Sequence, residues 1–432
     1  MSALPSQVNY NEPLLRLPEN TTNFLAAALP TNGSSFGPGS IAQVDLQTNR
    51  GFLDPASLSI RYKVVTTSAT GTKAKLVGTP AYTFINRFVC YANSQTIETI
   101  SNYNTVANLL TNIKLSTAQK LGQQYSLGYL AADPTDPVDN EDIDGRICAT
   151  STDTFYVSAP LYCLLGNSEK LIPLFLLQNM RMEFTFESVA NITSNLVGDQ
   201  KAIDYEISNF EVVYNVIDFG GEIQRQIMME NPKILIKTSS YNTSIAPIAS
   251  GTNGNINLIY NLRYASIKSA FLNFGGTSTN DTTGSANKNM DSFDVTAGTG
   301  DYSLQIAGMS YPQKSLSTLN NKAGIMNELR RAMGSLFNNN NSMSINSLEF
   351  GKDDGDGTEY NIPAKFWVGF NLQKLTIESK AFFSGVSTQN SPITAIINTN
   401  HATGQSINAM LIAVYDAIIE IDTQTKQCVI VS

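Results

Sequence analysis

The sequence has few of the residues from which catalytic and metal-binding sites are usually built. Its 432 residues include one histidine, His401, and four cysteines, Cys90, Cys148, Cys163 and Cys428, none of which belongs to a CxxC pair. Zinc sites, Ser-His-Asp triads and Cys-His pairs depend on these two residue types. We interpret His401, in a polar segment between two expected strands, as a surface residue, and the cysteines as free thiols of a reducing compartment.

Two acidic segments are the remaining candidates for a cation site. Residues 140–145 match the first half of a calcium-binding loop, but Ser151 occupies the position that requires a bidentate glutamate. Residues 353–357 lack the ligand spacing too. Both are interpreted as solvated turns, with a weak cation site at a subunit interface as the alternative. Phosphate-binding loops, dinucleotide fingerprints and nucleophile elbows are missing as well. The sequence therefore predicts no catalytic residue, no cofactor and no metal, and a protein that is not an enzyme.

Charge is scarce and, on balance, negative. Charged residues make up 15% of the chain, the formal net charge is −8, and Arg330-Arg331 is the only adjacent pair of arginines. A chain of this kind repels phosphate backbones, so direct nucleic-acid binding is not expected. Asn, Ser, Thr and Gly take the place of charge, as is typical of β-rich chains with many turns. Interface cores are also depleted in charge, so this composition favours a protein that is covered by copies of itself.

Long apolar runs are missing. Purely apolar segments, such as residues 174–177, are far shorter than the roughly 20 residues of a membrane-spanning helix. The N-terminus does not resemble a signal peptide, since its first basic residue is Arg16 and prolines interrupt it. We therefore expect a soluble protein that is made in the cytosol.

Alternation of apolar and polar residues is the dominant pattern that is present. It predicts antiparallel strands with one buried and one polar face. The clearest examples are residues 58–64, 180–186, 203–216, 256–264, 366–372, 410–421 and 428–431. Within residues 203–216 the apolar phase slips by one position near Ser208-Asn209, which predicts a β-bulge.

Helical spacing is confined to a few segments, and their positions suggest two halves. Residues 102–121 and 322–337 each place apolar side chains on one helical face, and residues 222–230 can form a short helix. The last of these follows Gly220-Gly221 and precedes an extended segment, as expected of a joint. We predict an extended N-terminal arm over residues 1–44, a first domain over 45–220, a linker over 221–231 and a second domain over 232–432. A disordered terminus is the alternative to the proline-rich arm.

Weak internal similarity favours duplication of one domain. Gly166 precedes Pro173 by seven positions, as Gly385 precedes Pro392, and each proline leads into an expected strand, 174–177 or 393–397. A later Val-Tyr-Asn or Val-Tyr-Asp element follows in each half, at residues 213–215 and 414–416.

Several segments, in this order, resemble a known family. Residues 51–55, Gly-Phe-Leu-Asp-Pro, followed by the strand at 58–64, are similar to an early strand of double jelly-roll major capsid proteins of virophages and polinton-like viruses, the lineage of the adenovirus hexon. Residues 84–88 and 95–104 resemble the family's strand that ends in Ile-Glu-x-Ile-x-x-Tyr-Asn before a helix. Tyr311-Pro312 with the following helix, residues 383–388 and residues 414–416 resemble features of the second barrel.

The resemblance implies an all-β fold of two consecutive jelly-roll β-barrels with a few short helices in connecting loops. It implies a major capsid protein of an icosahedral DNA virus, located in the virion and made in the cytoplasm of the host cell. Homotrimers of this type form pseudo-hexagonal blocks, which contact neighbouring trimers and also penton and minor capsid proteins. Contact with an internal membrane is left open.

Two other functions are alternatives. One is a minor capsid or vertex protein of the same virion. The other is a secreted β-sandwich that binds carbohydrate, which usually carries a row of exposed aromatic residues. Here Trp367 is the only tryptophan, and it lies within an apolar strand, where core or interface packing is expected.

Overall fold

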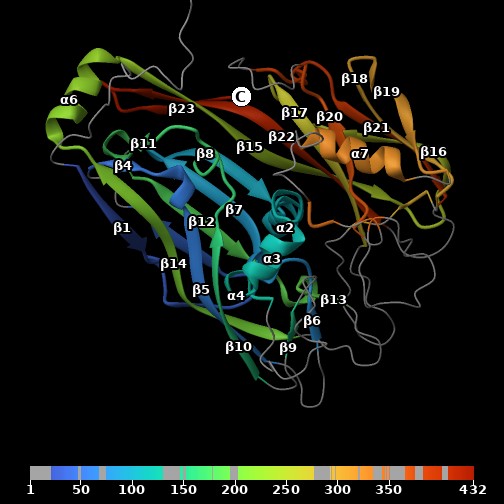
Figure 1. The fold of residues 1–432 in the computed structure, drawn as a ribbon, viewed down its shortest axis with the longest axis horizontal. Coiled ribbons are helices and arrows are strands. Elements are labelled where there is room, and N and C mark those ends of the chain that lie inside the picture. Colours follow the sequence, from blue (N-terminus) through green and yellow to red (C-terminus); the bar gives the residue numbers. More distant parts are fainter. Residues whose placement is uncertain are drawn as a thin grey trace, which may run out of the picture.

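The computed structural model shows a chain that is mostly β-structure, arranged as two bodies side by side (Figure 1). The residues that it describes are 21–46, 50–67, 74–129, 146–148, 152–177, 179–194, 203–276, 292, 294–296, 298–319, 322–333, 343–345, 347, 350, 365–374, 383–400 and 407–432.

Two large antiparallel sheets and one small one form the first body. In one of the large sheets β14 is central, with β5 and β10 on one side and β1 on the other. The other large sheet has the order β3-β12-β7-β8. The strands are β1 (Thr22–Ala28), β3 (Ile41–Asp45), β5 (Ser59–Thr67), β7 (Ile85–Ala92), β8 (Gln95–Ser101), β10 (Thr152–Pro160), β12 (Arg181–Phe186) and β14 (Asp204–Asp218). Short strands complete this half: β2 (Ser35–Phe36), β4 (Phe52–Leu53), β11 (Ile172–Pro173), β6 (Ala74–Leu76), β9 (Ile147–Cys148) and β13 (Thr193–Ser194).

The second body is built in the same way. Its sheets have the orders β15-β22-β17-β20 and β16-β21-β18-β19, and β23 pairs with β22. The strands are β15 (Lys233–Ile248), β16 (Asn253–Tyr260), β17 (Ile267–Gly276), β18 (Asp301–Ile306), β19 (Met309–Ser317), β20 (Val368–Asn371), β21 (Ile393–Asn400), β22 (Ile407–Asp422) and β23 (Cys428–Val431).

The two bodies share one strand order. When the eight principal strands of each are numbered along the chain, one sheet reads 1-8-3-6 and the other reads 2-7-4-5 in both bodies. Eight antiparallel strands in two facing sheets of this order form a jelly roll. The predicted fold class, two consecutive jelly rolls in one chain, is confirmed, and the two bodies are called the first and second barrel below.

Pairing registers identify equivalent positions in the two barrels. Val213 in β14 lies opposite Ser59 in the third strand, and Val414 in β22 lies opposite Ser269 in its third strand. The two Val-Tyr elements of the sequence therefore occupy the same place in the eighth strand of each barrel.

The other part of the proposed internal repeat is wrong. Residues 393–400 form a strand, β21, but the expected strand at 174–177 is a 3-10 helix, Leu174–Leu176, that follows β11. A short apolar run without alternation indicates burial and does not distinguish a strand from a buried turn. Leu174 and Leu176 are indeed fully buried.

The predicted bulge and helices are found with small differences in their ends. Pairing of β14 with β5 shifts between Ser208 and Glu211, next to Asn209 with its positive φ of 52°. The expected helix at 102–121 is two helices, α2 (Tyr103–Lys114) and α3 (Thr117–Gly122), because Ser116 starts a new helix through a capping box with Gln119. The others are α1 (Pro80–Thr83), α4 (Gln124–Leu127), α6 (Gly221–Glu230) and α7 (Ala323–Ala332). Residues 334–337 of the expected second helix lie outside the described residues.

The prediction of an extended N-terminal arm over residues 1–44 is wrong for residues 22–44. Residues 22–45 supply β1, β2 and β3 to both sheets of the first barrel, so they belong to the barrel, whereas residues 1–20 lie outside the described residues. The prolines of this segment are compatible with strands because neither lies inside one. Pro30 lies just after β1, in an isolated antiparallel bridge with Val44, and Pro38 lies in the turn before β3, where a missing N–H costs little.

Candidate functional site

The structure places few of the residues that the sequence singled out for chemistry. His401 and the acidic segments at 140–145 and 353–357 lie outside the described residues. Across the part of the chain that the structure describes, no cluster of three or more His, Cys, Asp or Glu side chains is suited to hold a metal ion. None of the described helices has the length and apolar character to cross a membrane. Trp367 is fully buried, as predicted for a core residue.

All four cysteines are buried free thiols, as interpreted from the sequence. Burial raises the pKa of the Cys148 thiol to about 12 and that of Cys428 to about 11. The pKa of the Cys90 and Cys163 thiols is raised further, again chiefly by burial. Thiols in this state are poor nucleophiles at neutral pH, so they have packing roles.

The two barrels are joined by a contact that contains buried polar side chains. It brings β8, the fifth strand of the first barrel, and the segment after β10 against β15, the first strand of the second barrel. Thr238 Oγ1 donates to the Leu164 carbonyl oxygen at 2.5 Å, and Thr243 Oγ1 donates to the Ser101 carbonyl oxygen at 3.1 Å. Asn167 Nδ2 donates to the Ser239 carbonyl oxygen at 2.8 Å. This inter-barrel junction is therefore held by many polar contacts.

A carboxyl group lies at the centre of the inter-barrel junction. Glu98 in β8 is 3% exposed. Both of its oxygens accept a hydrogen bond from the Leu164 N–H at 2.9 Å, and Ser240 Oγ of β15 donates to Oε1. No ion pair among the described residues includes Glu98. Burial raises its pKa to about 7, and the hydrogen bonds from Ser240 and Leu164 limit the rise.

The helix α2 extends the junction along the outer face of the second barrel. Leu110, Ile113 and Lys114 of α2 face Ser269, Phe271 and Val414 across a pocket of about 430 Å³, which α7 closes with Ala332 and Met333. Lys114 Nζ also donates to the Tyr241 hydroxyl at 3.3 Å. The outer face of strands β17 and β22 is thus covered by the first barrel's helix.

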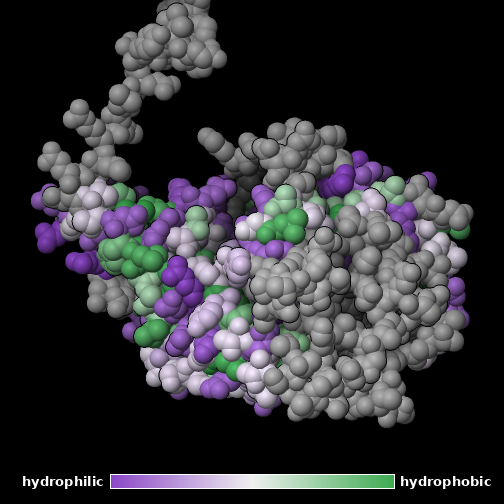
Figure 2. Space-filling view, turned by 60° about the horizontal axis from the view of Figure 1, so that its bottom comes forward, coloured by the Kyte–Doolittle hydropathy of each residue, from purple (hydrophilic) through white to green (hydrophobic). Residues whose placement is uncertain are grey.

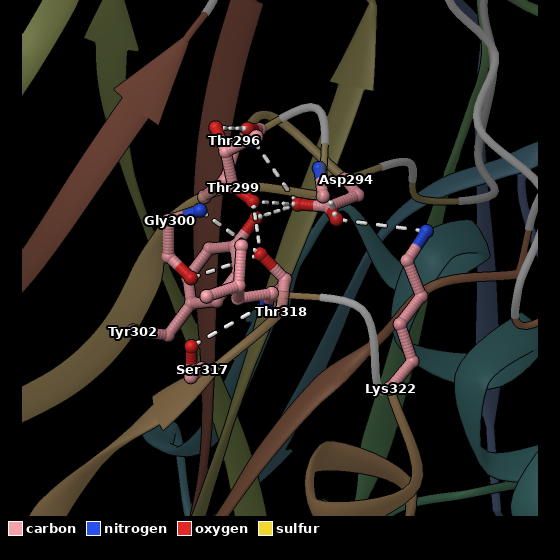
Figure 3. A network of polar contacts seen from close by, with 10 residues as sticks. Asp294, Thr296, Thr299, Gly300, Tyr302, Ser317, Thr318 and Lys322 are labelled. Carbon is pink, nitrogen blue, oxygen red and sulfur yellow. Dashed lines mark hydrogen bonds and ion pairs between the residues drawn. The ribbon is translucent and has the colours of Figure 1, made fainter.

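A buried polar network fixes the connections at one end of the second barrel (Figure 3). Asp294 accepts hydrogen bonds from the Tyr302 hydroxyl at 2.7 Å and from Thr296 Oγ1 at 2.6 Å, and its Oδ2 lies 3.6 Å from Lys322 Nζ. Thr296 and Thr318 share a hydroxyl contact of 2.7 Å. Since Lys322 directly precedes α7 and Thr318 follows β19, the network joins the segment before β18 to the start of α7. The polar groups of this network hydrogen-bond to one another, which indicates a structural role.

The first strand of the first barrel is unusually exposed and apolar. Among the described strands, β14 is the one partner of β1. Leu25 is 59% exposed, and Leu29, just beyond the strand, is 64% exposed. Residues 20–44 contain no charged side chain. Figure 2 shows apolar patches interrupting the polar surface at the end of the molecule where β1 and β14 lie.

A groove of about 590 Å³ adjoins this strand on the outer face of β5, β10 and β14. Leu29 forms part of its wall, and the largely exposed rings of Tyr125 and Tyr156 form another part. The charged side chains of the groove are partly paired with one another, since Arg61 Nη1 lies 3.9 Å from Glu211 Oε1. The groove therefore offers apolar and aromatic surface with a small excess of positive charge, because Arg61 and Lys63 face a single carboxylate, Glu211.

The sequence did not reveal Glu98, Asp294 or the exposed face of β1 as special positions. Glu98 and Ser240 are 142 positions apart in the chain, and no local sequence pattern predicts a contact between residues so far apart. The uncharged stretch at 20–44 was visible, but the prolines turned its interpretation toward an arm.

The fold is shared with solved viral capsid proteins. A Faustovirus major capsid protein matches over 96% of this chain and 92% of its own, with a TM-score of 0.61 at 9% identity. The mavirus major capsid protein matches over 100% and 95%, with a TM-score of 0.56 at 10% identity. A PBCV-1 virus capsid model matches over 95% and 97%, with a TM-score of 0.58 at 12% identity. No family model matches the sequence. No curated protein matches it either. The likeness to double jelly-roll capsid proteins is thus confirmed for the fold.

Proposed function

We propose that this chain is a major capsid protein of an icosahedral DNA virus and that its homotrimers tile the capsid shell. One observation carries the proposal: two jelly rolls of identical strand order stand side by side in one chain, joined through a buried contact. The full-length likeness to the Faustovirus and mavirus proteins supports it, since those are major capsid proteins by name.

The division of the chain follows from this proposal. The first jelly roll, proposed for residues 45–220, is best extended back to residue 22, because β1 and β3 complete its sheets. α6 occupies the proposed linker at 221–231, and the second jelly roll covers 232–432. Three chains would supply six barrels, which suit a pseudo-hexagonal block.

A structural role in the virion accounts for the chemistry of the chain. The proposed protein has no enzymatic activity. It does not bind nucleic acid directly, because its net charge is negative. Its proposed partners are other copies of itself, neighbouring trimers, and penton and minor capsid proteins. Synthesis in the host cytoplasm suits its buried free thiols.

Light scattering on the purified chain, followed by electron microscopy, tests the proposal. We expect a trimer of the 46.9 kDa chain with a pseudo-hexagonal outline. A stable monomer at micromolar concentration would contradict it. In purified virions this chain should be the most abundant protein, because a vertex or minor capsid protein would be present in far fewer copies. A competable signal on a glycan array would instead favour the carbohydrate-binding alternative.

A further inference from the structure

The inter-barrel junction inside each chain joins a different strand position from each barrel. The fifth strand of the first barrel, β8, lies against the first strand of the second barrel, β15. Both barrels have the same strand order, so each chain carries a second pair of the same kind that is not used internally. This pair consists of β1, the first strand of the first barrel, and β19, the fifth strand of the second.

Pairing registers show which residues of β1 correspond to the junction residues of β15. The equivalent valines Val213 and Val414 pair, on the side away from the third strand, with Ala27 and Tyr241. Counting from this pair places Phe24, Leu25, Ala26, Ala27 and Leu29 at the positions of Thr238, Ser239, Ser240, Tyr241 and Thr243.

Equivalent positions differ sharply in exposure. Ser240 and Tyr241 are 0% and 3% exposed because the first barrel covers them, whereas their equivalents Ala26 and Ala27 are half-buried and exposed. Leu25 and Leu29 are 59% and 64% exposed, whereas the equivalent side chains of β15 are half-buried. The uncovered positions are also the apolar ones. An open edge strand with exposed apolar side chains promotes association, and proteins that remain monomeric usually protect such edges with charge.

We propose that β1 is the surface on which the β19 side of the second barrel of another copy of this chain packs. The contact repeats between copies the β8-to-β15 arrangement within each copy. This inference rests on the proposed function and names the surface by which the copies associate. β19 suits the role, because its one partner among the described strands is β18 and because it is exposed along most of its length. It presents the exposed Met309, and Lys314 is its one charged residue.

The two surfaces lie at opposite ends of the molecule (Figure 1). A contact between two different surfaces is heterologous, and its repetition gives either a closed ring or an open filament. In a ring of three copies, three junctions within chains would alternate with three between chains, and all six would join a fifth strand to a first strand. The tyrosine-lined groove beside β1 lies within the same outer face and would be covered together with it.

Charged substitutions in β1 test the proposal. The double variant Leu25→Asp, Leu29→Asp should fold with an unchanged circular dichroism spectrum, because both side chains are exposed. Its self-association should be on the order of a hundredfold weaker by light scattering, as expected for charge in the centre of an apolar interface. Met229→Asp is the control, since Met229 on α6 is also an exposed apolar residue, at 83%, and lies outside the proposed contact. It should assemble as the wild type does.

The outcomes separate this inference from the proposed function. A wild-type chain that stays monomeric would contradict both. A wild-type trimer whose Leu25→Asp, Leu29→Asp variant assembles equally well would overturn only this inference, and would assign β1 to a different partner.

Chemical cross-linking tests the pairing of the two surfaces. A Leu25→Cys chain mixed with a Met309→Cys chain should give a cross-linked dimer with a short bis-maleimide reagent, and neither chain alone should. The native cysteines are buried and remain unreactive. Cross-linking of Leu25→Cys chains to one another would show a symmetric contact through β1 and would overturn the proposal.

Discussion

At the scale of single residues, Glu98 makes the junction between the barrels sensitive to pH. The thiols and phenols that face it, from Cys90, Cys163, Tyr103, Tyr241 and Tyr415, have raised pKa values and stay uncharged near neutral pH. Among the described residues, Lys114 is the cation that contacts this group of side chains, and its Nζ lies 3.3 Å from the Tyr241 hydroxyl. Ionised Glu98 is therefore a buried charge without a counter-ion among the described residues.

Glu98→Gln should remove this pH dependence. The pKa of Glu98 is raised from 4.5 to about 7, so the folded state binds the proton more tightly than the unfolded state does. The stabilisation is complete below about pH 4.5 and is lost as the pH rises through 7, by roughly 3 kcal/mol in total. Urea unfolding between about pH 5 and pH 8 should show this loss in the wild type and not in the variant.

The exposed Glu230→Gln variant is the control, and its free energy of unfolding should follow the wild type at each pH. Equal pH dependence in Glu98→Gln and the wild type would show that Glu98 does not titrate in this range.

Asp294 should be one of the most sensitive positions of the second barrel. Asp294→Ala removes the carboxylate that accepts hydrogen bonds from the Tyr302 and Thr296 hydroxyls and that lies 3.6 Å from the Lys322 ammonium. We expect a loss of about 3–5 kcal/mol in the free energy of unfolding, because one partner of a buried network has been removed. Asp301→Ala, at the start of β18, should cost less than about 0.5 kcal/mol. Similar losses for the two variants would contradict the role of the network.

At the scale of elements, the N-terminal segment contains two parts with different roles. β1 and β3 each complete a sheet, so deletion of residues 1–44 should prevent the first barrel from folding. Deletion of residues 1–20 should leave the barrel and the trimer intact and should impair the formation of capsids, as expected for an arm that contacts a neighbour. Circular dichroism and light scattering distinguish the two deletions, and normal capsids from the shorter deletion would remove the role of the arm.

The strands were predictable where a single period of two persists. Residues 58–64, 180–186 and 410–421 all correspond to strands, and even the bulge near Ser208 was visible as a change of phase. The prediction failed where buried apolar residues do not alternate with polar ones, as in the 3-10 helix Leu174–Leu176. It failed also where prolines lie between strands. It failed entirely at the junction, since the Glu98–Ser240 contact depends on how two barrels dock.

At the scale of the whole molecule, the scarcity of charge predicts an association that salt barely weakens. The residues that we place in the contact between copies, such as Leu25 and Leu29, are apolar, and residues 20–44 carry no charge. Exposed ion pairs contribute little energy and are screened by salt, whereas apolar contacts are not. Light scattering at low and high salt should give the same mass, and dissociation at high salt would indicate an interface held by ion pairs.

The linker helix α6 offers a reason why the two kinds of junction differ in chemistry. Its ten residues, Gly221–Glu230, tether the barrels of one chain, so the second barrel is always present near the first at a high effective concentration. A tethered contact does not have to offset the loss of translational and rotational freedom that free partners incur. Hydroxyl groups and a buried carboxyl group therefore suffice within the chain. Separate copies receive no such help, and the equivalent positions of β1 are leucine, phenylalanine and alanine.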